Sequence, residues 1–306
     1  MKNLYLSLKT RPFVMVLGRG NEDMTVLPRQ FAKAMGATAE NGRYMQLQVP
    51  MDWMDSSDLF GHLNLEGNFI PGAIIDFLKK AQNDPQKPYF LCLDRVNLSR
   101  AEYYLREVLA SVTNREPLVP VIYYGRDADA LARYGQIPAL ENLYIIGTTN
   151  LDEASLPLNQ KLLDKVYTVY LQAQLKIDEL PEAERENSFF EAKYQTIGDD
   201  LAQAQGYFPL FEQLNKILTE ATTYMGYQLR NDAVVYLMNN DVMTRSAAED
   251  QMICQKVLTR LQGSKKLLPV LQKLLDFCQG KYPMAEKALR RMALQCQEED
   301  FTSYWG

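Results

Sequence analysis

The sequence has one histidine, four cysteines and no long apolar run, and each scarcity excludes a class of protein. His62 is the only histidine among 306 residues, which argues against metal centres and catalytic triads that depend on imidazole. The cysteines form no CxxC pair, so neither a zinc ribbon nor a disulfide scaffold is indicated, and we expect a reducing compartment, the cytoplasm. We interpret all four cysteines as ordinary packing residues.

Features of membrane proteins and of export are absent as well. Lys9 and Arg11 interrupt the short apolar run near the N-terminus, whereas a secretory signal needs an unbroken apolar stretch. No segment approaches the ~18–20 apolar residues of a membrane span. Positive charge is not in excess, because 33 Lys and Arg stand against 38 Asp and Glu, for a net charge of −5. We expect no membrane partner, and only indirect or weak contact with DNA.

The first part of the chain alternates strand-like and helix-like segments. Four apolar or alternating runs have the length of strands: PFVMVLG (12–18), YMQLQV (44–49), YFLCLD (89–94) and LYIIGTTN (143–150). Helical patterns lie at 27–35, 73–81 and 101–111. This alternation predicts an α/β domain with a parallel sheet over residues 1–175, and the continuous apolar runs predict strands that are buried on both faces.

The rest of the chain has a helical pattern. Residues 176–206 are rich in Glu, Gln and Asp, and we interpret them as a helical connector with solvated faces. From residue 207 to 306, apolar side chains recur at the i, i+3, i+4 spacing of amphipathic helices, beginning with Phe208, Phe211 and Leu214. We expect an all-helical domain here, with Gly226 ending its first long helix.

The turn after the first strand has the spacing of a phosphate-binding loop without its chemistry. In GRGNEDMT (18–25), Gly18 and Thr25 match the ends of G-x-x-x-x-G-K-[ST], but Asp23 replaces the second glycine and Met24 the lysine. The missing ammonium removes a contact worth about 1.5–3 kcal/mol. A carboxylate ~4 Å from a phosphate costs about 4 kcal/mol at an effective dielectric near 20. The alternative is a surface turn that has never bound a nucleotide.

Two further strand ends carry polar residues in the order expected of a nucleotide site. Asp94 ends the run at 89–94, where a metal-holding aspartate would lie. Arg95 follows it at the position of a catalytic glutamate, and a guanidinium cannot accept a proton from water. Asn150 ends the run at 143–150, the position of a residue that orients the γ-phosphate or the attacking water. Singly, each of these residues is an ordinary turn residue.

Taken together, these segments resemble the AAA+ module of the McrB-like family, motors of modification-dependent restriction systems within the dynein-related AAA group. The resemblance runs through most of the chain, including 8–18, 41–78, 90–105, 142–166, 255–264 and 301–305. It implies an AAA+ core of P-loop NTPase type followed by a helical lid at 207–306. It places Gly18 and Thr25 on the phosphate loop, Asp94 at the Mg²⁺ position, Asn150 at sensor 1 and Lys165 at the arginine finger.

The departures from the family pattern imply lost catalysis. Asp23, Met24, Arg95 and Lys165 each replace a residue that turnover needs, although Lys165 keeps the charge of the arginine. The resemblance therefore implies a pseudo-ATPase subunit of a McrB-like restriction and phage-defence complex. Such a subunit would assemble with itself or with an active motor and a McrC-like nuclease, and would require no cofactor. The alternative is a weak or unorthodox NTPase that binds ATP or GTP with Mg²⁺. A free-standing DNA-binding adaptor fits the acidic chain less well.

Several other residues have simpler interpretations. We expect Trp53 to anchor its loop against the core and His62 to be structural or solvated. The aspartates at 52, 55 and 58 are interpreted as helix caps rather than a cation site. The pairs Lys265-Lys266 and Arg290-Arg291 are interpreted as solvated helix faces, with DNA contact as the alternative. Tyr304-Trp305 should pack on the helical domain.

Overall fold

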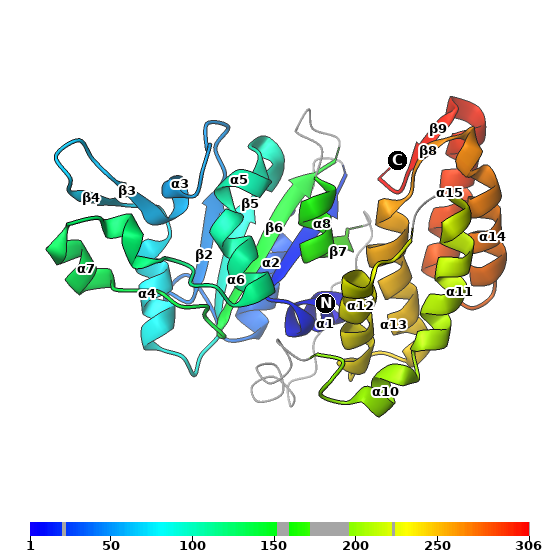
Figure 1. Ribbon diagram of the computed structural model, residues 1–306, viewed down its shortest axis with the longest axis horizontal. Coiled ribbons are helices and arrows are strands. Elements are labelled where there is room, and N and C mark those ends of the chain that lie inside the picture. Colours follow the sequence, from blue (N-terminus) through cyan, green and yellow to red (C-terminus); the bar gives the residue numbers. More distant parts are fainter. Residues whose placement is uncertain (20–22, 152–158, 172–195, 222–223, 306) are drawn as a thin grey trace. The chain divides into compact units, whose positions relative to one another are not determined.

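The computed structural model describes residues 1–19, 23–151, 159–171, 196–221 and 224–305. The chain forms two compact units. The α/β unit comprises Arg11–Lys193, and the helical unit comprises Lys2–Thr10 together with Tyr194–Gly306. The helical unit is therefore discontinuous in sequence. Within the α/β unit the chain runs from blue to green in Figure 1.

The α/β unit is built on a five-stranded parallel sheet. Its strands, in spatial order, are β2 (Tyr44–Gln48), β5 (Tyr89–Asp94), β6 (Leu143–Asn150), β1 (Phe13–Gly18) and β7 (Tyr167–Tyr170). Every neighbouring pair is parallel. The predicted α/β class and parallel sheet are confirmed, and the arrangement is consistent with a P-loop ATPase-like fold. Strand β7 was not predicted, because YTVY is too short to stand out as an apolar run.

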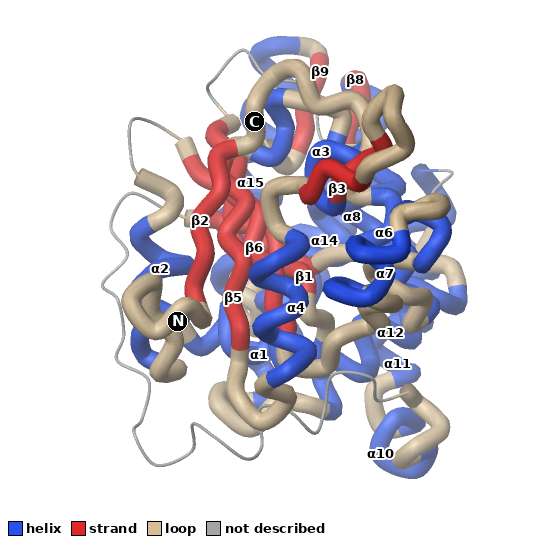
Figure 2. Tube along the Cα trace, turned by 90° about the vertical axis from the view of Figure 1, so that its left-hand side faces the viewer, coloured by secondary structure: helices blue, strands red, loops and turns tan. Residues whose placement is uncertain are grey.

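Helices cover both faces of this sheet, which explains its uninterrupted apolar strands. Figure 2 shows α2 (Val26–Ala34) on one side of the strands and α6 (Arg106–Asn114) and α8 (Gln160–Lys165) on the other. On the α2 side, the ring of Phe31 meets that of Phe90 edge to face, with centroids 5.7 Å apart. All six residues of β1 are buried. The predicted helices at 73–81 and 101–111 correspond to α4 (Ile75–Asn83) and to α5 (Ala101–Tyr104) with α6.

Several short elements beside the sheet were not predicted. The antiparallel hairpin of β3 (Gly61–Leu63) and β4 (Phe69–Pro71) follows the short helix α3 (Ser57–Phe60). Gly61 begins the hairpin at φ +123°, where a Cβ would lie 2.3 Å from the Phe69 ring, so only glycine fits. The remaining short elements are η1 (Val96–Leu98), η2 (Val121–Tyr124) and α7 (Ala128–Tyr134).

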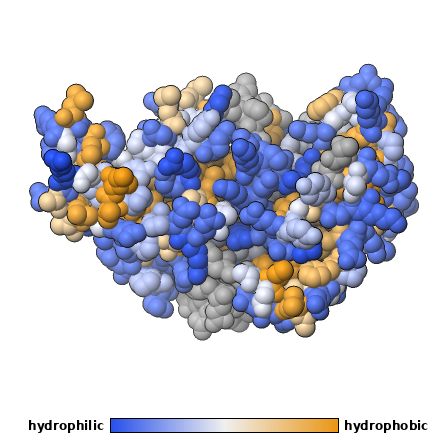
Figure 3. All heavy atoms as spheres, in the orientation of Figure 1, coloured by the Kyte–Doolittle hydropathy of each residue, from blue (hydrophilic) through white to orange (hydrophobic). Residues whose placement is uncertain are grey.

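The hairpin packs against η2 and α7 through aromatic rings. Phe69 meets Tyr124 with centroids 4.9 Å apart and Tyr134 with centroids 5.8 Å apart. Other apolar side chains here stay exposed, and Figure 3 shows them as a cluster over β3, β4 and α7. The name apolar patch is used for four of these exposed side chains, which lie on the hairpin and on η2: Leu65, Ile70, Val121 and Ile122. Exposed apolar groups of this kind are typical of binding surfaces.

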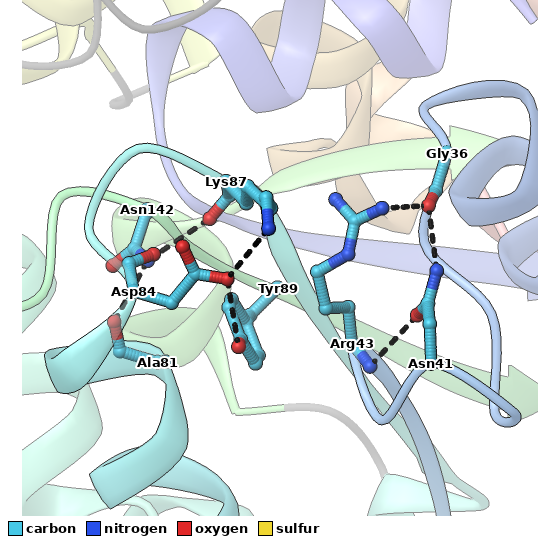
Figure 4. Close-up of polar contacts among 8 residues, drawn as sticks. All are labelled: Gly36, Asn41, Arg43, Ala81, Asp84, Lys87, Tyr89 and Asn142. Carbon is cyan, nitrogen blue, oxygen red and sulfur yellow. Dashed lines mark hydrogen bonds and ion pairs between the residues drawn. The ribbon is translucent and has the colours of Figure 1, made fainter.

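Polar contacts fix the amino-terminal ends of the strands, opposite the candidate site. The Asn142 amide nitrogen lies 2.9–3.0 Å from three carbonyl oxygens, those of Ala81, Asp84 and Lys87 (Figure 4). The Asp84 carboxylate also accepts a hydrogen bond from the Tyr89 hydroxyl at 3.3 Å. Before β2, the amide of Asn41 donates to the Gly36 carbonyl at 2.9 Å and the Arg43 guanidinium donates to the same oxygen. These contacts set where β2, β5 and β6 begin.

The helical unit confirms the helical pattern of the second part of the chain. Its elements are α1 (Lys2–Thr10), α10 (Leu201–Gln205), α11 (Phe208–Leu218), η4 (Thr219–Ala221), α12 (Tyr227–Met238), α13 (Arg245–Met252), η5 (Ile253–Val257), η6 (Leu258–Arg260), η7 (Lys265–Leu267), α14 (Leu268–Cys278) and α15 (Pro283–Glu299). A small hairpin of β8 (Gln262–Ser264) and β9 (Phe301–Ser303) departs from the all-helical prediction. The connector predicted at 176–206 lies mostly outside the described residues, apart from α10 and the turn before it.

Two expectations about this unit were wrong. Gly226 does not end a helix: its backbone is extended at φ −64° and ψ 165°, and it forms the N-cap of α12, while α11 ends at Leu218. Residues 2–10, predicted within the α/β domain, form α1 and belong to the helical unit. The reason is burial on every side: Leu4, Leu6 and Leu8 are fully buried, so this helix needs neighbours all round.

A polar network holds α1 among the other helices of its unit. The Asn3 side chain donates to Gln251 at 2.7 Å and accepts from Gln255 at 2.6 Å and from the Tyr236 hydroxyl at 3.0 Å. At the other end of α1, the Lys9 ammonium contacts the Asp241 carboxylate at 2.5 Å. Because such polar partners must match in position, they fix the register of α1 on α12 and α13.

The described residues contain no helix that is both long and apolar enough to cross a membrane. All four cysteines are free and buried, as the interpretation of ordinary packing residues predicts.

Candidate functional site

The sheet brings three of the predicted site residues to one edge. Gly18, Asp94 and Asn150 end β1, β5 and β6, which are adjacent strands. The register pairs Gly18 with Asn150, and Asp94 follows Leu93, which is paired with Gly147. The backbone N–H of Leu151 donates to the Gly18 carbonyl at 2.8 Å, which closes this edge between β6 and β1. In open parallel sheets ligands bind outside the carboxyl ends of the strands, so the edge is correctly placed for a site.

Asp94 is held by a residue that sequence reasoning missed. The Thr148 hydroxyl on β6 donates to the Asp94 carboxylate at 2.5 Å, and its oxygen accepts the backbone N–H of Arg95 at 3.1 Å. The signal was present in GTTN (147–150), where threonines end an otherwise apolar strand. Arg95 has a left-handed backbone, with φ 57° and ψ 51°, which is uncommon outside glycine. The Thr148 hydroxyl therefore fixes both the carboxylate and the turn that follows it.

The turn at the start of α2 is closed by one of its own carboxylates. The same oxygen of Asp23 accepts the Thr25 hydroxyl at 2.6 Å and the Thr25 backbone N–H at 2.9 Å. Its second oxygen lies 3.4 Å from the Arg29 guanidinium, a partner that sequence reasoning also missed. The hydroxyl of Thr25 is chiefly what lowers the pKa of Asp23 below its usual value, so this group is a carboxylate at neutral pH.

Met24 packs inward at the position of the phosphate-binding lysine. Its side chain is 5% exposed. A Cβ built on Gly18 would lie 2.1 Å from Cε and 2.4 Å from Sδ of Met24, so the thioether rests directly on the Gly18 backbone. A larger residue at position 18 would therefore displace the end of the Met24 side chain. The contact also means that an apolar group covers the end of β1, where a phosphate loop would present backbone to its ligand.

These residues do not fit a nucleotide with Mg²⁺ in the usual mode. The hydroxyl of Thr25, which would serve the metal, is already bonded to Asp23, and Met24 covers Gly18. Asp94 retains the carboxylate that a metal would need. Within the described part of the chain, no group of three or more Asp, Glu, Cys or His side chains is placed to hold a metal.

Lys165 lies away from these residues. It ends α8, two residues before Tyr167, and Tyr167 is paired with Val14 near the beginning of β1. Lys165 therefore lies toward the opposite edge of the sheet from Gly18 and Asn150. The structure does not bring it into the candidate site of its own chain.

The local contacts bear on three further interpretations. The Trp53 ring meets the buried Tyr104 ring with centroids 5.3 Å apart, as an anchor would. Asp55 accepts the backbone N–H of Ser57 at 2.8 Å, and Asp58 accepts that of Met54 at 3.2 Å. The N-cap of α3 is Ser56, without a side-chain cap hydrogen bond, so the helix-cap interpretation of these aspartates is not confirmed. His62 is exposed on β3.

The basic pairs of the helical unit are partly neutralised by acidic neighbours. Lys265 contacts Asp300, and Arg290 contacts Glu286 at 2.8 Å within one turn of α15. Arg291 donates to the carbonyl of Tyr304. These contacts favour the interpretation of solvated helix faces over a DNA surface.

Comparisons with known proteins concern mainly the second part of the chain. Residues 174–301 match the family described as "Domain of unknown function (DUF8727)", which spans less than half of the chain. No curated protein matches. Among solved structures, the chain is similar to a protein of Cytophaga hutchinsonii that is provisionally described as an ATPase, with 16% identity and a TM-score of 0.42. That similarity covers 82% of this chain and 73% of the other. At this TM-score it supports no conclusion about family or activity.

Proposed function

We propose that this protein is a catalytically degenerate AAA+ subunit, a pseudo-ATPase, of a McrB-like restriction and defence complex. The observation that carries the proposal is the contact between Met24 and Gly18. A lysine at position 24 would extend toward phosphates, whereas this methionine is buried against the backbone that would cradle them. The chain thus keeps the sheet of an NTPase and fills the place of the ligand with its own side chain.

Arg95 supports the loss of hydrolysis independently of the loop. Water attack on a phosphate needs a group that orients the water or accepts its proton, and a guanidinium at neutral pH accepts none. The Thr148 hydroxyl fixes the backbone of Arg95 immediately after Asp94. Arginine cannot act as a base in any rotamer at this position.

A subunit without hydrolysis would act through its association with other subunits. We propose that it associates with itself or with an intact McrB-like motor, with a McrC-like nuclease as a further partner, and that any DNA contact is indirect. Two surfaces support this proposal. Lys165 lies away from its own site, as a residue that serves a neighbour's site would. The apolar patch of Leu65, Ile70, Val121 and Ile122 exposes side chains of the kind found in interfaces.

One specific observation favours the alternative of a weak NTPase. Gly18, Asp94 and Asn150 still meet at one sheet edge, and the Asp94 carboxylate is still oriented by a hydrogen bond. In that alternative the chain binds ATP or GTP weakly with Mg²⁺, and Arg19, Arg95 or a residue of a partner replaces the missing groups.

Phosphate release and light scattering test the proposal together. We expect the purified chain to release phosphate from ATP or GTP with Mg²⁺ no faster than buffer does, and to form an assembly alone or with an intact motor. Steady release that disappears in Asp94→Ala would establish the alternative. A strictly monomeric protein that leaves every intact motor tested unaffected would remove the support for a subunit role.

A further inference from the structure

The amino-terminal turn of α2 contains an anion of its own. The backbone N–H groups at the start of a helix are unpaired within the helix and attract negative charge, which is why phosphates bind there in nucleotide-binding proteins. In this chain α2 has nine residues, and the group bonded at its start is the Asp23 carboxylate. Two donors beside this helix start, the backbone N–H and the hydroxyl of Thr25, are therefore already engaged.

Both oxygens of the Asp23 carboxylate have partners. One carboxylate oxygen accepts both the backbone N–H and the hydroxyl of Thr25, and the other faces the Arg29 guanidinium. Arg29 lies one turn into α2. The arrangement has the elements of an occupied phosphate site: a helix start, a hydroxyl and a guanidinium around one anionic group. The anion is covalently attached, so its effective concentration at the site is permanently high.

We propose that the Asp23 carboxylate is an internal substitute for phosphate that keeps the α2 turn closed without nucleotide and excludes nucleotide from it. This proposal rests on the proposed function and adds a regulatory consequence. The fold of this chain does not respond to added ATP or GTP, so any nucleotide dependence of an assembly must come from the partner.

Two explanations of weak nucleotide binding can be separated by experiment: exclusion by the Asp23 carboxylate, and loss of the phosphate-binding lysine alone. If only the lysine is missing, Met24→Lys alone restores affinity. If Asp23 also excludes the ligand, Met24→Lys remains weak until the carboxylate is removed, because the phosphates would meet a like charge and would have to displace it from Thr25.

Calorimetric titration with ATP, and separately with pyrophosphate, tests this in the full chain. The proteins are wild type, Met24→Lys, Met24→Lys with Asp23→Gly, and Met24→Lys with Asp76→Asn. Asp76 is a matched control, because it is exposed on α4 and paired with Arg133 at 3.1 Å. We expect the Asp23→Gly double variant to bind at least tenfold more tightly than Met24→Lys, about 1.4 kcal/mol, and the control to match Met24→Lys. Equal affinity in both double variants, or binding by neither ligand to any variant, would overturn the proposal.

Amide hydrogen exchange provides a readout that does not require a ligand. In Asp23→Ala, exchange at Thr25 should accelerate relative to wild type, and added pyrophosphate should slow it again. Unchanged exchange at Thr25 would also overturn the proposal. Neither measurement depends on hydrolysis or assembly. The proposed function can therefore fail while the role of Asp23 is upheld, and the role of Asp23 can fail while the proposed function is upheld.

Discussion

The hydroxyl of Thr148 donates a 2.5 Å hydrogen bond to the carboxylate of Asp94, across the boundary between β6 and β5. The same hydroxyl accepts the backbone N–H of Arg95. Thr148 therefore fixes both the Asp94 carboxylate and the backbone of Arg95 at the end of β5.

Replacing Thr148 with valine should destabilise the α/β unit. Valine keeps the branched shape that suits a strand but leaves the Arg95 N–H and one Asp94 oxygen without this partner, at an expected cost of about 1–3 kcal/mol. Thr148→Ser keeps the hydroxyl and should lose less. Urea unfolding followed by circular dichroism measures both variants. An unchanged midpoint for Thr148→Val would show that the hydrogen bond contributes nothing to stability.

Asn3 should matter to the helical unit although it lies at the other end of the sequence. Asn3→Ala removes the partner of Gln251, Gln255 and Tyr236, and should cost about 1–3 kcal/mol. Hydrogen exchange in α12 should accelerate accordingly. Lys2→Ala, a change at an exposed neighbour on the same helix, is the control and should have no such effect. If both variants exchange alike, α1 is not held by this network.

Charge reversal at Lys165 should weaken association while the fold remains intact. A half-exposed charge at a subunit boundary typically changes affinity less than a buried anchor does, so we expect a several-fold loss. Light scattering of wild type and Lys165→Glu, alone and with an intact motor, measures the effect. Lys161→Glu, one turn earlier on α8, tests whether the position or only the charge matters. Equal association of wild type and Lys165→Glu would remove this residue from the interface.

The cysteine thiols should be unreactive in the folded protein. Burial raises the pKa of Cys92 and of Cys278 to about 12 and raises the pKa values of Cys254 and Cys296 above normal. At pH 8 almost none of these groups is a thiolate, and all four are buried. A chromogenic disulfide reagent should detect no fast thiol in native protein and four in denaturant. A fast native thiol would indicate local opening around that residue.

Asp23 should make stability depend on pH in a defined direction. Its pKa is lower in the folded protein than in the unfolded chain, so its contribution is present above about pH 4 and is lost as pH falls through the folded pKa. Wild type should therefore be more stable than Asp23→Asn at pH 6, and the difference should shrink as the pH falls below about 4. The effect should be small, since this side chain is more than half exposed. A difference independent of pH would mean that charge is not involved.

The long apolar strands were the most predictable part of the fold. Residues 13–18, 89–94 and 143–150 differ from the predicted segments by at most one residue, because a strand buried on both faces has an uninterrupted apolar sequence. The hairpin β3–β4 and the strand β7 were missed for the opposite reason. They are three or four residues long, and the hairpin carries exposed apolar and polar side chains without alternation.

The positions of the candidate site residues were predictable, but their contacts were not. Strand ends can be read from the sequence, and parallel strands bring their ends together, so Gly18, Asp94 and Asn150 meet as expected. Nothing in the sequence indicates that Asp23 turns back onto Thr25, or that Met24 lies on Gly18 rather than in solvent. Those contacts depend on rotamers within the turn. The roles of these residues in binding or catalysis stay predictions.

The placement of α1 has a consequence for how the protein comes apart. The chain crosses from one unit to the other between Thr10 and Arg11 and again between Lys193 and Tyr194. A single cut at the second crossing would leave the α/β piece still carrying α1, which is seated among α12 and α13 of the other piece. The severed halves would therefore co-purify as a noncovalent pair. A fragment limited to residues 174–301, the segment matched by the family, would lack one of the helices that complete its own core.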